Sequence, residues 1–512
     1  MSKIATIGTL SALSLILFII YTPLLTAYYC SYDDFNELFK AQYVDSSDLS
    51  NIYKRPHFRI TNWRPLHELE MVVWSWFGKS APLAARFENL IFQIICMWLV
   101  YGISRVWATP LASLVAAAFF GFHFHNHVAV AAASWSITTA HSLILSSLLL
   151  FLRFYNRDSN NYFSVVALSA LSLAATLFYD PAIGVLPACV VFMLCKKYFF
   201  HQQYNMRALF IVFISSMVTI VVYVIVRVQY VGLNGAVNYL QPAATALKNA
   251  AAVFMLLFVP ADPLLLHEWF KVPLLSREWF GPGLKVAAVA VSIAFVLLIL
   301  NCRRAVNLVF RAVQRIRMEP LLFCAICAAA YLAPVFGFSQ WVSFASLHFP
   351  LALLSVCGAS LLTDLGLKSG CSMRMVFMLL LLFLVCSISG IYIRNRRVHA
   401  CGATAYAILS NIQGEMKNAD AGQIGIAPAA NSLKAKKFSF YNLSGLDVLG
   451  LHIGKEGVQG AIRWFLEDKN LSVFVGEEGV LPEECKLDES KIKCFIVLSD
   501  GEVCSAGQQR RE

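Results

Sequence analysis

Apolar segments of about 20 residues, the length that crosses a bilayer as a helix, recur along the chain. Lipid offers no partners to the backbone, so such segments must be helical. We therefore expect a polytopic α-helical membrane protein. Charged residues make up 14% of the sequence, against roughly 25% in soluble proteins, which excludes an ordinary soluble domain. Eleven spans are expected, near 5–27, 85–106, 109–125, 135–154, 162–179, 182–200, 208–229, 284–301, 320–337, 344–363 and 375–393.

Basic residues are distributed unevenly between these spans. The short breaks 121–134, 179–181 and 338–343 contain no Lys or Arg. The positive-inside rule therefore predicts a cytoplasmic N-terminus and places these three breaks outside. Much of the net charge of +11 is this cytoplasmic excess, and no nucleic-acid-binding module is evident. The breaks on the other side contain Arg105, Arg153, Arg157, Lys196, Lys197, Arg207, Arg303, Arg304, Arg311, Arg315, Arg317, Lys368 and Arg374.

Two domains are expected. Residues 1–395 form the transmembrane domain, in which the outer segment 231–283 is re-entrant or interfacial, or a hairpin that raises the number of spans to thirteen. Residues 396–512 lack a spanning run and predict a small extracytoplasmic α/β domain, of a size that folds independently. We expect strands at 471–475 and 494–498 and a helix at 405–416. The domain contains Cys401, Cys485, Cys494 and Cys504, which allow three disulfide connectivities.

The first outer loop, 28–84, contains the candidate catalytic residues. Asp33 and Asp34 directly follow the first span, and a carboxylate is a suitable general base. The loop continues with basic residues, and Arg is the side chain best shaped to hold phosphate. We interpret this segment as a catalytic loop, and the alternative is a polar loop whose acids are solvated or balance nearby Arg. The basic candidates are Arg55, Arg59, Arg64 and His67.

Two further polar groups lie at the outer ends of spans. His125 and His127, with His123 just before them, predict a polar rim of a substrate cavity or an interfacial turn, and zinc binding is the alternative. Asp180 ends the fifth span. Acids within a membrane tend to mark function, whereas an acid at the surface costs little, so both interpretations of Asp180 stay open.

The order and sidedness of these motifs resemble the GT-C class of integral membrane glycosyltransferases, in particular the branch with the protein O-mannosyltransferases. Asp33-Asp34 matches the acidic motif of that class after the first helix. Asn62-Trp63-Arg64-Pro65-Leu66 is similar to its Arg-Pro entry to the second span. The segment 179–187 is similar to a Lys-Glu-x-Ala-Ile-x-x-Pro-like pattern, with Asp180 in place of the acid. The sequence departs from the class at Ala131, where a Glu is common, and at His348, which partly replaces an Arg.

The resemblance implies a GT-C-like hexosyltransferase that takes a sugar from a polyprenyl-phosphate donor dissolved in membrane lipid. The acceptor is a hydroxyl of a protein, lipid or glycan on the outer face, most simply of a bacterial inner membrane. Asp33 is expected to act as base and Asp34 as its support. No cofactor is expected, and a divalent metal is not favoured. Donor phosphate and sugar are expected near Arg55, Arg59, Arg64, His67, His125, His127, Asp180 and His348.

Two other functions are consistent with these features. A transporter or flippase for a lipid-linked glycan needs the same basic and aromatic residues but no base, and the inverted repeats typical of transporters are not evident. A catalytically inactive GT-C-like scaffold would use its outer domain to bind a partner, and the two departures from the class pattern keep this alternative open.

Overall fold

The computed structural model describes residues 2–28, 64–131, 136–156, 162–200, 206–231, 244, 316–338, 347–364, 370–417, 422–428, 455–468, 471–477, 480–487, 492–497 and 503–505. The expected span 284–301 and the outer segment 232–283, apart from residue 244, lie outside these residues. So do Asp33, Asp34, Arg55 and Arg59.

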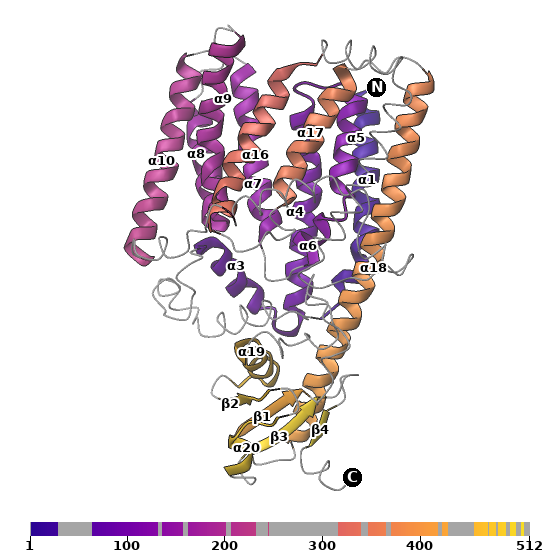
Figure 1. Ribbon diagram of the computed structural model, residues 1–512, viewed down its shortest axis with the longest axis vertical. Helices are drawn as coiled ribbons and strands as arrows, with labels where there is room; N and C mark the ends of the chain where they lie inside the picture. The colour runs from indigo at the N-terminus through magenta and orange to yellow at the C-terminus, as the bar shows by residue number, and fades with distance from the viewer. Residues whose placement is uncertain are drawn as a thin grey trace.

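A bundle of apolar helices forms the larger part of the molecule (Figure 1). Helices occupy ten of the eleven expected spans, and five helices of the described part are long and apolar enough to cross a membrane. The bundle helices are α1 (Lys3–Leu25), α4 (Ala81–Ser104), α5 (Pro110–Gly121), α7 (Ile137–Asn156), α8 (Tyr162–Phe178), α9 (Val185–Phe200), α10 (Met206–Val231), α16 (Met318–Phe338), α17 (His348–Asp364) and α18 (Gly370–Lys417). Short helices connect them: α3 (Pro65–Ser75), η2 (Gly78–Ser80), α6 (Asn126–Ala131) and η3 (Asp180–Gly184).

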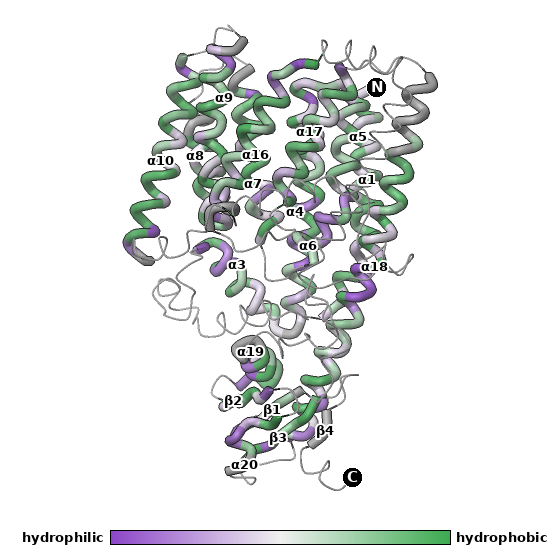
Figure 2. The backbone as a smooth tube through the Cα atoms, in the orientation of Figure 1, coloured by the Kyte–Doolittle hydropathy of each residue, from purple (hydrophilic) through white to green (hydrophobic). Residues whose placement is uncertain are grey.

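The outward-facing surface of this bundle is apolar too. Phe210 and Ile225 of α10 are 64% and 59% exposed, and Figure 2 shows the upper bundle as mostly hydrophobic. A continuous exposed apolar surface is unfavourable in water. In lipid it is the expected exterior, so these helices belong in a membrane.

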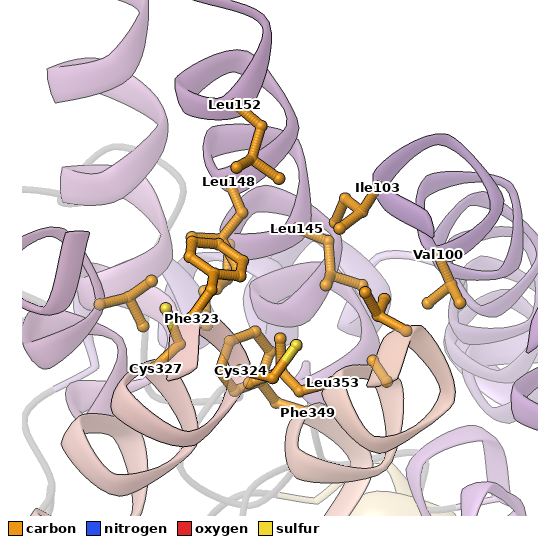
Figure 3. Packing of buried hydrophobic residues seen from close by; sticks show 14 of the residues in the cluster. Val100, Ile103, Leu145, Leu148, Leu152, Phe323, Cys324, Cys327, Phe349 and Leu353 are labelled. Atoms are coloured by element: carbon orange, nitrogen blue, oxygen red, sulfur yellow. The ribbon is translucent and has the colours of Figure 1, made fainter. Parts of the chain in front are cut away.

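Aliphatic and aromatic side chains, with some alanine and cysteine, fill the interior of the bundle (Figure 3). Phe323 of α16 lies at its centre, with its ring centroid 5.1 Å from that of Phe192 and 5.3 Å from that of Trp107. Cys324 and Cys327 of the same helix are free and buried. They pack in the hydrophobic core as small apolar groups.

Ion pairs join the helices at the end of the bundle where the N-terminus lies (Figure 1). Arg317, just before α16, pairs with Asp364 at the end of α17 at 2.7 Å and donates to the carbonyl of Trp107. Lys196 of α9 pairs with Glu319 of α16 at 2.7 Å. Both cations come from breaks that the sequence assigns to the cytoplasmic side.

α18 runs without interruption from the bundle to a small sheet (Figure 1). Its 48 residues include the expected helix at 405–416, and the expected domain boundary at 395–396 lies inside it. The polar segment around that boundary, Arg394-Asn-Arg-Arg-Val-His-Ala400, contains no Gly or Pro. A change of polarity therefore ends the apolar span there without ending the helix, because helix formation requires no apolar side chain.

The sheet has the strand order β2-β1-β3-β4. β1 (Gln423–Pro428) is parallel to β2 (Ser472–Val475) and to β3 (Ile492–Val497), and β4 (Val503–Ser505) is antiparallel to β3. The helices α19 (Lys455–Leu466) and α20 (Glu484–Leu487) accompany it. β2 and β3 coincide with the two expected strands. Of the cysteines in this part, Cys485 and Cys494 form a disulfide, and Cys401 is a buried thiol.

Candidate active site

The first outer loop leaves α1 at a point fixed by a buried arginine. Arg86 of α4 is fully buried and donates to the carbonyl oxygens of Ala27, Tyr28 and Ala131. A buried guanidinium must satisfy its donors within the protein. Arg86 therefore fixes the backbone directly before the segment that contains Asp33 and Asp34.

The same loop returns to the bundle at Arg64, the residue before α3. Pro65 is the first residue of that helix, a position that suits proline because its missing N–H would have no helical partner. The guanidinium carbon of Arg64 lies 4.6 Å from the ring centroid of Tyr179, a cation–π distance. Arg64 Nε has no hydrogen-bond partner among the described residues.

Asp180 opens the tight turn η3 directly after Tyr179. Its neighbour Pro181 is buried and fits the first helical position. At the end of this turn, a Cβ on Gly184 would overlap the carbonyl of Ala330, so glycine lets η3 pack against the backbone of α16. The turn therefore holds Asp180 next to the helix that contains Tyr331.

Asp180 is the centre of a charged group. The hydroxyl of Tyr223 donates to Asp180 Oδ1 at 2.9 Å, and Arg227 Nη1 donates to that hydroxyl at 2.6 Å. Arg227 Nη1 also lies 3.8 Å from Asp180 Oδ2. Arg64 is close enough to interact with the same carboxylate through its charge. One carboxylate thus lies near two guanidinium groups, from α10 and from the first outer loop.

A buried chain of polar side chains continues inward from this group. Tyr331 hydrogen bonds to Tyr179, and its hydroxyl lies 2.7 Å from His141 Nε2. The Nδ1 atoms of His141 and His348 are 2.9 Å apart, and His348 Nε2 is 2.6 Å from Gln93 Oε1. Because one Nδ1 must donate and the other accept, at least one of the two histidines is neutral. His348 is thus linked through His141 to Tyr331 and Tyr179, the tyrosines next to Arg64.

A second polar group lies on α3, next to the first. His67 Nδ1 is 2.6 Å from Ser136 Oγ. Glu70, 9% exposed, accepts from Thr139 Oγ1 at 3.3 Å and interacts with Glu88 of α4. Burial and the neighbouring carboxyl of Glu88 raise the pKa of Glu70 well above its usual value. This group joins α3 to the bundle beside Arg64.

The structure places His125 and His127 in a different environment. His127 Nε2 is 2.9 Å from Asn395 Oδ1 of α18, and Asn395 donates to the carbonyl of Ile20. The His125 ring stacks on His123 at 4.8 Å. These contacts connect α6 to α18 and α1. No group of three His, Cys, Asp or Glu side chains in the described part of the chain is arranged to hold a metal.

Of the sequence-predicted residues, the structure brings Arg64 and Asp180 together, with His67 and His348 in the polar groups on either side. Asp33, Asp34, Arg55 and Arg59 lie outside the described residues. Sequence reasoning missed Tyr223, Arg227, His141 and Tyr331 as partners. Arg227 and His141 each interrupt an apolar run, and an ionisable residue inside such a run is the signal that could have identified them.

Fold and site together define a helical membrane protein with a charged cluster at the return of its first outer loop. A scan of the sequence finds no matching family model, and no curated protein matches it. The structure is similar to that of the oligosaccharyltransferase of Archaeoglobus fulgidus, with a TM-score of 0.47 and 13% identity over 92% of this chain and 62% of that one. This chain thus spans about three fifths of that protein's length.

The structure is also similar to that of ArnT from Cupriavidus metallidurans. The apo state matches with a TM-score of 0.47 and 12% identity over 91% of this chain and 85% of ArnT. The structure of ArnT bound to undecaprenyl phosphate matches with a TM-score of 0.42 and 13% identity, over 92% of this chain and 78% of ArnT.

Proposed function

We propose that this protein is a membrane glycosyltransferase that moves a sugar from a polyprenyl-phosphate-linked donor to a hydroxyl acceptor on the outer face of a bacterial inner membrane. The observation that supports it most strongly is the placement of Arg64 and Arg227 around Asp180, where the first outer loop returns to the bundle. The acceptor is a protein, lipid or glycan, and residues 396–512 lie on its side of the membrane.

A phosphate fits the chemistry of this cluster. Guanidinium groups bind phosphate oxygens through paired, charge-assisted hydrogen bonds. Arg64 is half-buried, and its buried Nε has no partner among the described residues, so a phosphate oxygen would satisfy a donor that is otherwise left unsatisfied. The Tyr179 ring packs against the Arg64 guanidinium and holds it in place, so the Arg64 side chain loses less conformational freedom when a ligand binds.

The reaction needs a base at the acceptor, and the proposal assigns this role to Asp33. Asp33 takes the proton of the acceptor hydroxyl, whose oxygen forms a bond to the anomeric carbon. The bond from that carbon to the lipid phosphate breaks, and the phosphate leaves with the electron pair. Arg64 and Arg227 stabilise its added negative charge. Adjacent side chains of an extended chain point in opposite directions, so only one of the two acids can face the reacting atoms. Asp34 then has the structural role beside the base Asp33.

Arg64→Ala tests the donor site. Losing a hydrogen bond to a charged group costs about 1.5–3 kcal/mol, so we expect the apparent affinity for a short-chain polyprenyl-phosphate sugar to fall about tenfold or more. Arg396 is exposed on α18, and Arg396→Ala serves as the matched control. Unchanged donor dependence in purified Arg64→Ala protein would remove Arg64 from the site.

Asp33→Asn separates transfer from binding in the same assay. A general base contributes roughly 10²–10⁴-fold in rate, so turnover should fall by that factor while the donor still binds. Asp34→Asn should lose less. Normal transfer in both variants would overturn the assignment of the base, whereas donor binding without transfer by the wild-type protein would favour a transporter of lipid-linked glycans over an enzyme.

A further inference from the structure

We propose that Asp180 is a specificity-determining residue that makes the donor site select a lipid monophosphate over a lipid diphosphate. The inference rests on the proposed function, since it concerns the donor of that reaction. It assigns to Asp180 a task other than catalysis: lowering the positive charge that the two arginines present to the ligand.

The charges in the cluster are unequal. Arg64 and Arg227 supply two positive charges, and Asp180 supplies one negative charge within 3.8 Å of Arg227. Their sum is +1. The sugar–phosphate–lipid donor is a phosphodiester with a single negative charge, which this sum balances. A diphosphate-linked donor carries two negative charges. The second charge is not balanced by the cluster, and the carboxylate of Asp180 repels it.

The position of Asp180 is fixed, so the ligand cannot displace its charge cheaply. Its carboxylate accepts from Tyr223 at 2.9 Å, and Asp180 opens a turn whose second residue, Pro181, is buried. The other end of that turn, at Gly184, packs directly against the backbone of α16. The Asp180 side chain is 22% exposed and the Arg227 side chain is 23% exposed. Charges in such partly buried positions are screened less than they are in bulk water.

The charge balance also serves turnover. When the sugar leaves, the lipid phosphate becomes a monoester, whose second proton is lost with a pKa of about 6. The product then approaches two negative charges at neutral pH. Repulsion from Asp180 weakens the binding of this dianion relative to a site with two arginines alone. Asp180 therefore favours release of the spent carrier.

The test uses purified full-length protein in nanodiscs and compares a short-chain polyprenyl monophosphate sugar with the corresponding diphosphate sugar. We expect the wild-type protein to bind the monophosphate about tenfold or more tightly, because the second charge of the diphosphate leaves water without a cation to balance it. Asp180→Asn should bind both ligands and narrow this ratio, chiefly through tighter binding of the diphosphate. Glu319→Gln removes an equally exposed carboxylate, 25% against 22%, that pairs with Lys196 elsewhere in the bundle, and should keep the wild-type ratio.

The outcomes separate this inference from the proposed function. Binding of neither ligand by the wild-type protein would overturn both. Equal binding of the two ligands by the wild-type protein would overturn the selectivity and leave a lipid-phosphate site in place, whether or not Asp180→Asn folds. An unchanged ratio in folded Asp180→Asn would show that another residue discriminates.

Discussion

At the scale of single residues, Glu70 of α3 is a buried carboxyl group for which ionisation is unfavourable. It is 9% exposed and lies beside the second carboxyl, Glu88. Its raised pKa means that the folded protein prefers the protonated form. Ionisation therefore costs nothing below the usual value of 4.5 and destabilises the fold progressively as the pH rises from there towards the folded-state pKa.

Glu70→Gln should remove this pH dependence, because the amide copies the neutral carboxyl. We expect a higher melting temperature than that of the wild-type protein at pH 7 to 8, and a difference that vanishes near pH 4, measured by thermal unfolding in detergent. Glu415→Gln is the control, since Glu415 is 53% exposed and forms only a surface pair with Lys493. A constant difference between Glu70→Gln and wild type at every pH would contradict the assignment.

At this scale, the sequence reveals single residues more readily than partnerships. Arg64 and Asp180 stand out because each is charged at the edge of an apolar segment. Their association could not be predicted, because it depends on how η3 packs against α16 and where α10 lies. His127 shows the same limit, since only the fold reveals that its ring contacts Asn395 of α18.

Among the elements, α18 makes the most consequential contact. Its Gly402 lies against the start of the first outer loop, where a Cβ would come within 2.6 Å of the oxygen and 2.8 Å of the nitrogen of Tyr28. The Tyr28 ring packs against Tyr406 of α18 and Phe465 of α19 at 5.4 and 6.3 Å. α18 and α19 therefore both contact the residue at which the first outer loop begins.

Gly402→Ala should push the Tyr28 backbone away from α18 and lower both the melting temperature and the rate of transfer. Gly414 lies in the same helix with open space around its Cβ position. Gly414→Ala is thus a matched control, expected to gain about 0.5–1 kcal/mol from helix propensity alone. Equal behaviour of the two variants in thermal unfolding would show that the contact at Tyr28 is dispensable.

For the whole molecule, the sequence predicts the positions of helices well, since the length of an apolar run is a property of the run alone. It does not reveal that α18 continues through the polar segment at the expected domain boundary. The order of the strands also escapes it. β1, the central strand, was not predicted, and its neighbours β2 and β3 are far from it in sequence.

The topology predicts opposite exposure for the two ends of the bundle. The predicted topology assigns Met318, which is 56% exposed, to the cytoplasmic end and Glu415 to the outer one. In intact cells, a membrane-impermeant maleimide should label a cysteine that replaces Glu415. A cysteine that replaces Met318 should react only after permeabilisation. Labelling of both from outside would refute the orientation, and the wild-type protein gives the background of its own thiols.

The length of the uninterrupted helix α18 also determines how far the protein extends beyond the membrane. A helix of 48 residues is about 72 Å long, whereas a bilayer with its headgroups measures about 40–45 Å. If α18 stands perpendicular to the membrane, its end projects roughly 30 Å beyond the lipid, and the sheet follows directly after this end. This projecting part lies next to the first outer loop, because Tyr406 of α18 and Phe465 of α19 both contact Tyr28 at the start of that loop. Under the proposed function, an acceptor therefore reaches the loop past the side of the sheet and its helices.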